Sequence, residues 1–283
     1  AFAWVDGGIV PREEARVSID DFAVRYGAAC FETMLARGGR VFRLDAHLDR
    51  LQAGLRAMGV APPARDTLVR AVQETLAANG LTEASVRLTV TAGSGHAPDL
   101  SRAASPGVIV TADPPPPAPA PPRLRVVATR VDARRPLAGA KTAQFLPYLL
   151  GRAEARAAGA DDALLLNHAG AVVEAATANV FLLRDGRLET PTLADGPLPG
   201  ITRAVLIEVA GDLGVPVVER TLSLDDIALA EALLLTSSVA GVVPAASLLA
   251  APPDAPGHLD WRPREPAPAE VARLLAGYTA ALG

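Results

Sequence analysis

Hydrophobic and polar residues in the first hundred positions follow a pattern that predicts an antiparallel sheet with two helices. Short apolar runs flank two turn dipeptides, Asp6-Gly7 and Gly38-Gly39, as in β-hairpins. Leucines recur at helical spacing after Asp45, which we expect to be the N-cap of the first helix, and a second helix is predicted over residues 66–79. Alternation over residues 86–91 predicts a return to the sheet.

The second half of the chain alternates short apolar strands with amphipathic helices. Strands are predicted at residues 123–129, 163–166, 172, 179–183, 215–219 and 232–236, and helices at 147–158, 200–211, 224–230 and 268–282. We interpret residues 250–266 as a surface excursion. The whole pattern predicts a mixed fold, with α+β and α/β elements in both halves.

A proline-rich stretch separates the two halves. Seven of the ten residues from 113 to 122 are prolines. Because proline fixes φ and lacks a backbone donor, this stretch suits neither a helix nor a central strand, and we expect a stiff, extended linker. The sequence therefore predicts a small α/β domain at residues 1–112, a linker at 113–122 and a larger domain at 123–283.

Composition narrows the range of partners. The chain has 283 residues and a formal net charge of -4, and its mixed charges give no basic stripe for nucleic acid and no polybasic patch for a membrane. The single cysteine, Cys30, excludes an internal disulfide, favours a reducing compartment and is interpreted as a small buried hydrophobe. We expect no secretory leader or membrane span. The prediction is a cytoplasmic protein that acts on small molecules, and we assign no metal site.

Lys141 is the only lysine in a chain whose lysines and arginines total 27. Arginine serves wherever only a positive charge is needed, because a guanidinium stays protonated. A lysine amine can lose its proton and form an imine with an aldehyde. The solitary lysine therefore favours a covalent carbonyl-binding site, and the chance survival of one surface lysine is the alternative.

An enzyme that binds pyridoxal phosphate through a lysine also needs an anion for the pyridine nitrogen and donors for the phosphate. Glu174 is a lone carboxylate in an apolar, strand-like segment, where burial would require a partner; a hairpin glutamate facing water is the alternative. A helix beginning near Ile201 and Thr202 would offer free amides to an anion, unless it is a plain helix start. The serine-rich turn at 237–241 could complete a phosphate-binding cup with these amides. We interpret Asn179 as a local backbone clamp.

The spacing of residues from Glu174 to Arg203 resembles the signature of class IV pyridoxal-phosphate aminotransferases, the fold-type IV enzymes. The matching residues are Glu174, Asn179, Val180, Phe181, Leu188, Thr190, Leu198, Gly200, Ile201 and Arg203. The family includes branched-chain aminotransferases, D-amino-acid transaminases and aminodeoxychorismate lyases. The resemblance extends over residues 6–244. It implies a homodimer of two-domain subunits, each with a small α/β N-terminal domain and a larger pseudo-barrel C-terminal domain.

The resemblance also implies roles for individual residues. Lys141 would hold pyridoxal phosphate as a Schiff base, Glu174 would meet the pyridine nitrogen and Arg43 would bind the phosphate. The rest of the phosphate cup would be formed by Ile201, Thr202 and Ser238. One departure is Phe145, which stands near the position where several relatives have a tyrosine against the cofactor. His47 is interpreted as a structural helix residue.

Two arginines of the first domain favour a substrate that carries a carboxylate. Branched-chain relatives bind the substrate carboxylate with a strand that contains the sequence Tyr-x-Arg. Here Ser85 replaces the tyrosine and Arg87 remains. Arg25 stands where relatives usually have an uncharged residue. Two arginines in one pocket would hold a carboxylate by bidentate hydrogen bonds, unless both are surface residues. The predicted substrate-binding residues are Arg25, Arg87, Phe31, Val239 and Ala240.

We therefore predict a transaminase that moves the amino group of a D-amino acid, such as D-alanine or D-glutamate, to a 2-keto acid such as 2-oxoglutarate. Short motifs at residues 31–33, at 137–141 and at Ser238 resemble lyases, so aminodeoxychorismate lyase is the alternative. A branched-chain aminotransferase and an inactive binding module are further alternatives. The retained lysine argues against the inactive module.

Overall fold

The computed structural model describes residues 1–103, 105–249 and 259–283, and the chain divides into two compact units. Unit 1 comprises Ala1–Pro117 and Ala140–Gln144, and unit 2 comprises Ala118–Gly139 and Phe145–Gly283. The first boundary lies inside the proline-rich stretch. The segment Ala140–Gln144, which the predicted boundaries assign to the second domain, groups with unit 1 instead.

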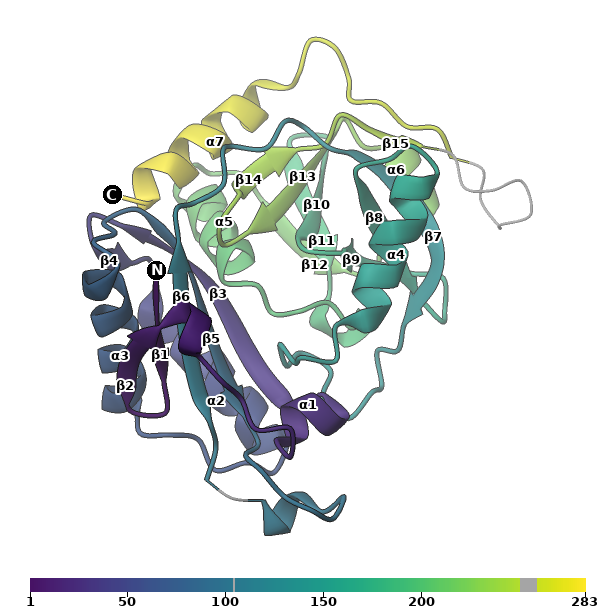
Figure 1. The fold of residues 1–283 in the computed structure, drawn as a ribbon. Helices are drawn as coiled ribbons and strands as arrows, with labels where there is room; N and C mark the ends of the chain where they lie inside the picture. Colours follow the sequence, from purple (N-terminus) through teal and green to yellow (C-terminus); the bar gives the residue numbers. More distant parts are fainter. Residues whose placement is uncertain (104, 250–258) are drawn as a thin grey trace. The chain divides into compact units, whose positions relative to one another are not determined.

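Unit 1 is built on a six-stranded antiparallel sheet with the order β2-β1-β6-β5-β3-β4 (Figure 1). Its strands are β1 (Phe2–Val5), β2 (Gly8–Pro11), β3 (Ala29–Arg37), β4 (Arg40–Val41), β5 (Ala84–Thr91) and β6 (Val108–Asp113). Its helices are α1 (Phe22–Tyr26), α2 (Leu44–Ala57) and α3 (Arg65–Ala78), with the 3-10 helices η1 (Arg12–Glu14) and η2 (Leu100–Arg102). Both predicted hairpins and both predicted helices are present, whereas β6 and α1 were not predicted.

Side-chain alternation gives the sheet of unit 1 two different faces. The residues of β5 that join the core with α2 and α3 are Ala84, Val86, Leu88 and Val90. Cys30 and Met34 of β3 belong to the same core. Because neighbouring residues of a strand point to opposite faces, Arg87 and Phe31 lie on the other side of the sheet, and Glu32 lies on the helix side.

The start of α2 differs from the prediction. The helix begins at Leu44 and its N-cap is Arg43, whose φ of 52° lies in the left-handed region, so the expectation of Asp45 as N-cap was wrong. Asp45 lies in the first turn, where a carboxylate interacts favourably with the helix dipole. There it also pairs with Arg65 at 2.7 Å. This pairing explains why the acidic residue stands close to the helix start without capping it.

Unit 2 contains two sheets, one with the order β12-β11-β10-β13-β14 and one with the order β15-β7-β8-β9. The strands are β7 (Arg123–Val131), β8 (Asp162–Asn167), β9 (Val172–Ala175), β10 (Asn179–Arg184), β11 (Arg187–Pro191), β12 (Val217–Arg220), β13 (Ala232–Ser237), β14 (Gly241–Pro244) and β15 (Ser247–Leu249). The helices are α4 (Leu146–Ala157), α5 (Ile201–Asp212), α6 (Leu224–Ala228) and α7 (Ala269–Ala281), with the 3-10 helix η3 (Leu193–Asp195). The strands and helices predicted for this half are all present, with small shifts at their ends.

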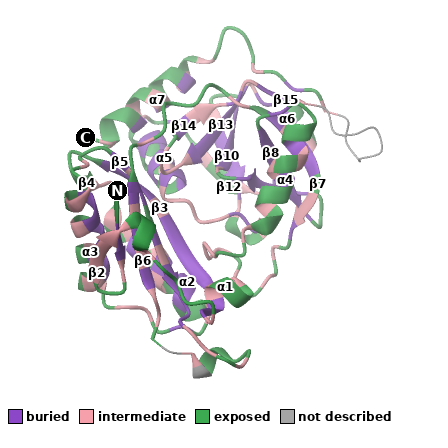
Figure 2. Cartoon of the chain, in the orientation of Figure 1, coloured by how far each residue is buried: buried purple, intermediate pink, exposed green. Residues whose placement is uncertain are grey.

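Both sheets of unit 2 contribute to one apolar core. Its members include Leu124, Leu164, Val180, Leu233 and Leu248. Helix α4 packs on β7 and β8, and α5 and α7 pack together beside β14 (Figure 1). The strands are largely buried, whereas α4 and α7 keep exposed faces (Figure 2). The mixed α and β architecture predicted from the sequence is confirmed.

Part of the predicted surface excursion at 250–266 belongs to the core. Residues 250–258 lie outside the described part of the chain. Trp261 is buried, its Nε1 donates to the carbonyl of Ala230 at 2.8 Å, and its backbone bridges to Leu248. The expectation was wrong for this residue because a buried indole adds a large apolar surface while its N–H finds an acceptor.

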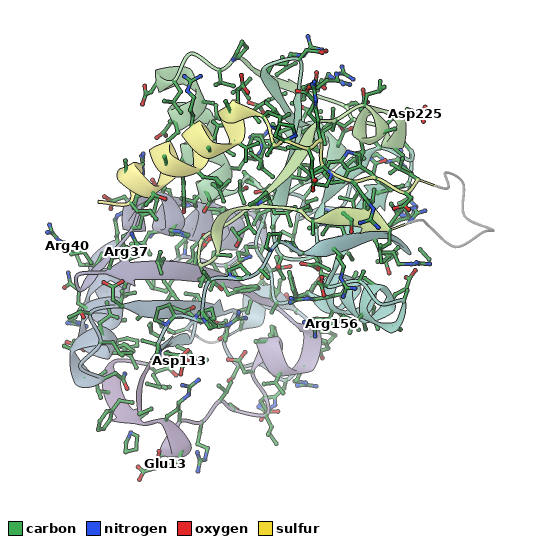
Figure 3. All side chains as sticks on the ribbon, turned by 90° about the horizontal axis from the view of Figure 1, so that it is seen from above. Glu13, Arg37, Arg40, Asp113, Arg156 and Asp225 are labelled. Atoms are coloured by element: carbon green, nitrogen blue, oxygen red, sulfur yellow. The ribbon has the colours of Figure 1, made fainter. Side chains whose placement is uncertain are left out.

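Charged side chains of both signs project from the surface (Figure 3). Labelled examples are Glu13, Arg37, Arg40, Asp113, Arg156 and Asp225. Within the three described ranges, no helix is both long enough and apolar enough to cross a bilayer.

Candidate active site

Lys141 lies on an extended segment that runs beside β3. The amide of Phe31 donates to the carbonyl of Lys141 at 2.9 Å, and the amide of Ala143 donates to the carbonyl of Ala29 at 2.8 Å. These bonds fix the backbone at the lysine and two residues beyond it. The sheet of unit 1 therefore holds the lysine backbone in place.

Small residues allow α2 to approach this segment closely. A Cβ built on Gly54 would lie 3.3 Å from Cβ of Ala140 and 3.1 Å from Sγ of Cys30. Burial, with a smaller contribution from the charge of Glu32, raises the pKa of the Cys30 thiol to about 11. Cys30 is therefore a neutral packing group at neutral pH, and its interpretation as a small buried hydrophobe is confirmed.

The ring of Phe31 has two cations over it. Nζ of Lys141 lies 4.8 Å and Cζ of Arg87 lies 3.8 Å from the ring centroid. Arg87 pairs in register with Thr33, two residues along the strand from Phe31 and on the same face. Although Arg87 is exposed as a whole residue, desolvation lowers the pKa of its guanidinium. The predicted catalytic amine and one predicted carboxylate-binding arginine thus share one aromatic surface.

Arg25 is held by partners on another loop. Its Nη1 donates to the carbonyls of Gly95 at 2.9 Å and His96 at 3.3 Å, and it lies 3.9 Å from a carboxylate oxygen of Asp20. The structure therefore brings Arg87, Phe31 and the lysine together, while Arg25 is fixed by a neighbouring loop of unit 1.

A buried ionic cluster lies between β3 and α2. The carboxylate of Glu32, which is fully buried, accepts hydrogen bonds from Nδ1 of His47 at 2.7 Å and from Nε and Nη2 of Arg50 at 2.8 and 2.6 Å. Burial alone would raise the pKa of Glu32, but the bonds from His47 and Arg50 outweigh it and lower the pKa below its usual value. His47 is therefore a structural residue, as its position in the sequence suggested.

The two arginines at the start and middle of α2 differ in their settings. Arg43 is exposed, with Cζ 5.8 Å from the ring centroid of Phe42. The side chain of Arg50 is only 9% exposed, and one turn later Gly54 meets Ala140 of the lysine segment. At the helical rise, Gly54 is roughly 16 Å along the axis from Arg43 but only about 6 Å from Arg50. Arg50, for which the sequence predicted no role, is thus closer along the helix to the lysine segment.

Glu174 is buried in β9 of unit 2, with 4% of its surface exposed. Its Oε2 accepts hydrogen bonds from the amide of Leu198 at 3.0 Å and from Nδ2 of Asn179 at 3.2 Å, and its Oε1 accepts one from the hydroxyl of Tyr148 at 3.0 Å. The alternative of a hairpin glutamate facing water is therefore wrong. A buried carboxylate with this many donors is held in one orientation.

Asn179 joins this carboxylate to the start of α5. Its Nδ2 also donates to the carbonyl of Leu198 at 2.8 Å, and a Cβ on Gly200 would lie 1.9 Å from its Oδ1. A residue with a side chain cannot replace Gly200 without moving Asn179. Asn179 does bond to backbone, but its partner lies 19 residues away, so the clamp is not the local one predicted, and the structure adds the contact with Glu174.

Helix α5 begins at Ile201 without a capping side chain, because its N-cap is Gly200. The first-turn amides of Ile201 and Thr202 therefore need an acceptor from elsewhere. Free amides at the positive end of a helix dipole suit an anion such as a phosphate.

The serine-rich turn lies at the same edge of the sheet. Asn179 pairs in register with Thr236 of β13. The residues that follow Thr236 therefore begin beside Asn179, whose side chain lies against Gly200. Those residues include Ser238, which is partly exposed, with Val239 and Ala240. Unit 2 thus gathers the predicted nitrogen partner, the helix start and the serine turn.

Known proteins match this chain over most of its length. Residues 29–248 match the family described as Amino-transferase class IV. A Methanocaldococcus jannaschii protein provisionally named branched-chain-amino-acid aminotransferase is 34% identical over 248 residues, which is 85% of each chain. The branched-chain aminotransferase of Thermoproteus uzoniensis, solved with norvaline, superimposes with a TM-score of 0.87 at 30% identity, covering 100% of this chain and 95% of that one. A Legionella pneumophila protein provisionally named 4-amino-4-deoxychorismate lyase gives a TM-score of 0.84 at 25% identity, covering 95% and 97%.

The chain therefore belongs to the class IV aminotransferase family. The family resemblance and the fold class predicted from the sequence are confirmed. Pyridoxal phosphate is the cofactor of this family, and a branched-chain aminotransferase of the same fold was solved with N-(5'-phosphopyridoxyl)-L-glutamate. The protein is an aminotransferase-family enzyme, and its relatives are named for more than one reaction.

Proposed function

We propose that the protein is a pyridoxal-phosphate transaminase that uses Lys141 as its catalytic amine and Arg87 to bind the substrate carboxylate. The observation that carries this proposal is the placement of the only lysine and of Arg87 over the ring of Phe31. An amino acid presents an amino group and a carboxylate on the same carbon, so a site for it needs a reactive amine and a fixed cation close together.

The residues of the chain fit pyridoxal phosphate. Glu174, buried and already oriented by its donors, suits a protonated ring nitrogen. The uncapped start of α5 suits the phosphate through Ile201 and Thr202, and Ser238 would add a hydroxyl. When bound, the cofactor supplies a ring that withdraws electrons from the substrate carbon. Nζ of Lys141 would take the proton from that carbon and would then deliver it to the cofactor carbon that is bonded to the transferred nitrogen.

The family resemblance implies an arginine as a further ligand of the phosphate. The sequence pointed to Arg43, which stays a prediction. The settings of the two side chains favour Arg50, because Glu32 orients it and it lies close to the lysine segment. A guanidinium that is already oriented loses less side-chain entropy when it binds a phosphate.

For the substrate, we propose D-amino acids with 2-oxoglutarate as acceptor. Arg87, with Ser85 in place of the tyrosine of branched-chain relatives, supports a strongly anionic substrate, and Arg25 adds positive charge in the same unit. The names of the Methanocaldococcus jannaschii and Thermoproteus uzoniensis relatives favour branched-chain amino acids as the second candidate. The name of the Legionella pneumophila relative favours a lyase as the third.

Three parallel assays separate these reactions. We expect purified protein with pyridoxal phosphate to convert D-alanine and 2-oxoglutarate to pyruvate and D-glutamate faster than it converts L-leucine and 2-oxoglutarate to the corresponding products. Formation of p-aminobenzoate and pyruvate from aminodeoxychorismate is tested in the same preparation. Faster turnover of L-leucine would replace the D-amino-acid proposal by the branched-chain one, and p-aminobenzoate alone would replace both by the lyase.

Arg87→Ala is expected to raise the KM for 2-oxoglutarate by about tenfold or more, because a charge-assisted hydrogen bond to the carboxylate is lost. Steady-state kinetics with varied keto acid measure this change. Arg37→Ala is the matched control, since Arg37 is an exposed arginine of β3 with a long ion pair to Glu83. An unchanged KM in Arg87→Ala would remove this arginine from the substrate site. Arg25→Ala is expected to have a smaller effect, because backbone carbonyls hold Arg25.

The homodimer and the cytoplasmic location expected from the sequence stay predictions.

A further inference from the structure

Tyr148 contacts the carboxylate that we propose for the ring nitrogen. It lies in the first turn of α4, and its hydroxyl is 3.0 Å from Oε1 of Glu174. Both residues belong to unit 2. No feature of the sequence marks Tyr148 as functional, and its contact with β9 follows only from the packing of the chain.

The hydroxyl of Tyr148 is fixed from two sides. Nη2 of Arg135 donates to the tyrosine oxygen at 3.3 Å. The ring of Phe145, one turn earlier, stacks on the ring of Tyr148 with centroids 4.9 Å apart and planes at 11°. Burial, and then the negative charge of Glu174, raise the pKa of Tyr148 well above its usual value. Tyr148 therefore stays protonated and donates to Glu174.

The donors to Glu174 are divided between its two oxygens. Asn179 and the Leu198 amide donate to Oε2, and Tyr148 donates to Oε1. The Tyr148 hydroxyl therefore holds the carboxylate oxygen that Asn179 and the Leu198 amide do not contact. The hydrogen bond that Arg135 donates to Tyr148 polarises the hydroxyl and strengthens its bond to Glu174.

We propose that Tyr148, oriented by Arg135 and Phe145, is a positioning residue that fixes the Glu174 carboxylate toward the pyridine nitrogen of bound pyridoxal phosphate. This inference rests on the proposed cofactor role of Glu174. It also gives Phe145 a function. Phe145 cannot donate a hydrogen bond, but its ring holds the tyrosine that stands three residues later on the same side of α4.

The decisive probe is a cofactor analogue in which carbon replaces the ring nitrogen. Tyr148→Phe removes only the hydroxyl, and we expect it to weaken the binding of pyridoxal phosphate to apoprotein by about tenfold, the effect of losing one hydrogen bond to a charged group. The same substitution is expected to leave the affinity for the carbon analogue unchanged, because that analogue makes no bond to Glu174. Absorbance or fluorescence titration of apoprotein measures both affinities without any turnover.

Two further variants complete the experiment. Tyr26→Phe, at an exposed tyrosine of α1, is the matched control and should bind both probes like the wild type. Arg135→Ala removes the donor to the tyrosine oxygen and keeps the Tyr148 ring, so it should show the same selectivity with a smaller loss. If Tyr148→Phe weakens both probes equally, its role is structural and the proposal is overturned. Unchanged affinity for pyridoxal phosphate overturns it as well.

The experiment also separates this inference from the function on which it rests. A wild-type protein that binds pyridoxal phosphate and transaminates, paired with an unaffected Tyr148→Phe variant, contradicts only the positioning role. A wild-type protein that does not bind pyridoxal phosphate contradicts the proposed function itself.

Discussion

Lys141→Ala is expected to abolish transamination, with turnover falling by about four orders of magnitude. In the proposed function this amine both attaches to the cofactor and moves the substrate proton, and no second lysine exists to replace it. Lys141→Arg is the sharper variant. It keeps a positive charge over the ring of Phe31 but cannot lose its proton, so it should be equally inactive.

Covalent trapping checks the same prediction without kinetics. Borohydride treatment of the wild-type protein with pyridoxal phosphate should add one phosphopyridoxyl group to the intact mass. Because the chain has a single lysine, the only other primary amine is its amino terminus, and peptide digestion separates the two. Label at the amino terminus alone, or near wild-type turnover by Lys141→Arg, would refute the assignment of Lys141.

Most elements of the fold could be predicted because their signals are local. Turn dipeptides marked both hairpins of unit 1, and apolar spacing marked α2 and α5 within a few residues. The position of Ala140–Gln144 could not be predicted in this way. This segment pairs with β3 through the amide of Phe31, a contact between residues far apart in sequence. Backbone pairing between residues far apart in sequence produces no hydrophobic periodicity in the segment that pairs with the sheet.

The site was predictable where a residue conflicted with its surroundings. A lone lysine among arginines, and Glu174 in an apolar strand, are such conflicts, and the structure confirms that Glu174 is buried. Tyr148 and Arg135 gave no such signal, because a tyrosine at the start of a helix is ordinary. Their relation to Glu174 depends on how α4 packs on its sheet, which local pattern does not specify.

The role of Arg50 was also hard to predict from local pattern, although the question concerns a single helix. A run with arginines at both 43 and 50 does not by itself show which one faces an anion. Spacing was nevertheless informative, since Arg50 stands three residues after the buried His47 and four before Gly54, on the side of α2 that meets β3 and the lysine segment. Arg43 stands at the left-handed N-cap, outside the regular helix.

The second large effect is expected at Arg50. Arg50→Ala should lower the free energy of unfolding by about 3–5 kcal/mol, because it leaves the buried charge of Glu32 with one partner fewer. Arg50→Lys keeps a positive charge but loses the two-pronged bond that orients the side chain. We expect Arg50→Lys to reduce the ratio of affinities for pyridoxal phosphate and pyridoxal by about tenfold, since that ratio isolates recognition of the phosphate.

Arg43, at the N-cap of the same helix, provides the matched control. Arg43→Ala should lower the free energy of unfolding far less than Arg50→Ala does, because its side chain is exposed, and it should leave the ratio of the two affinities near the wild-type value. Chemical denaturation and titration of apoprotein with both compounds measure the two quantities in each variant. If the ratio falls in Arg43→Ala and not in Arg50→Lys, the phosphate is bound at the helix start, as the sequence alone suggested. The ion cluster of Glu32, His47 and Arg50 would then stabilise the packing of α2 on β3 without contacting the cofactor.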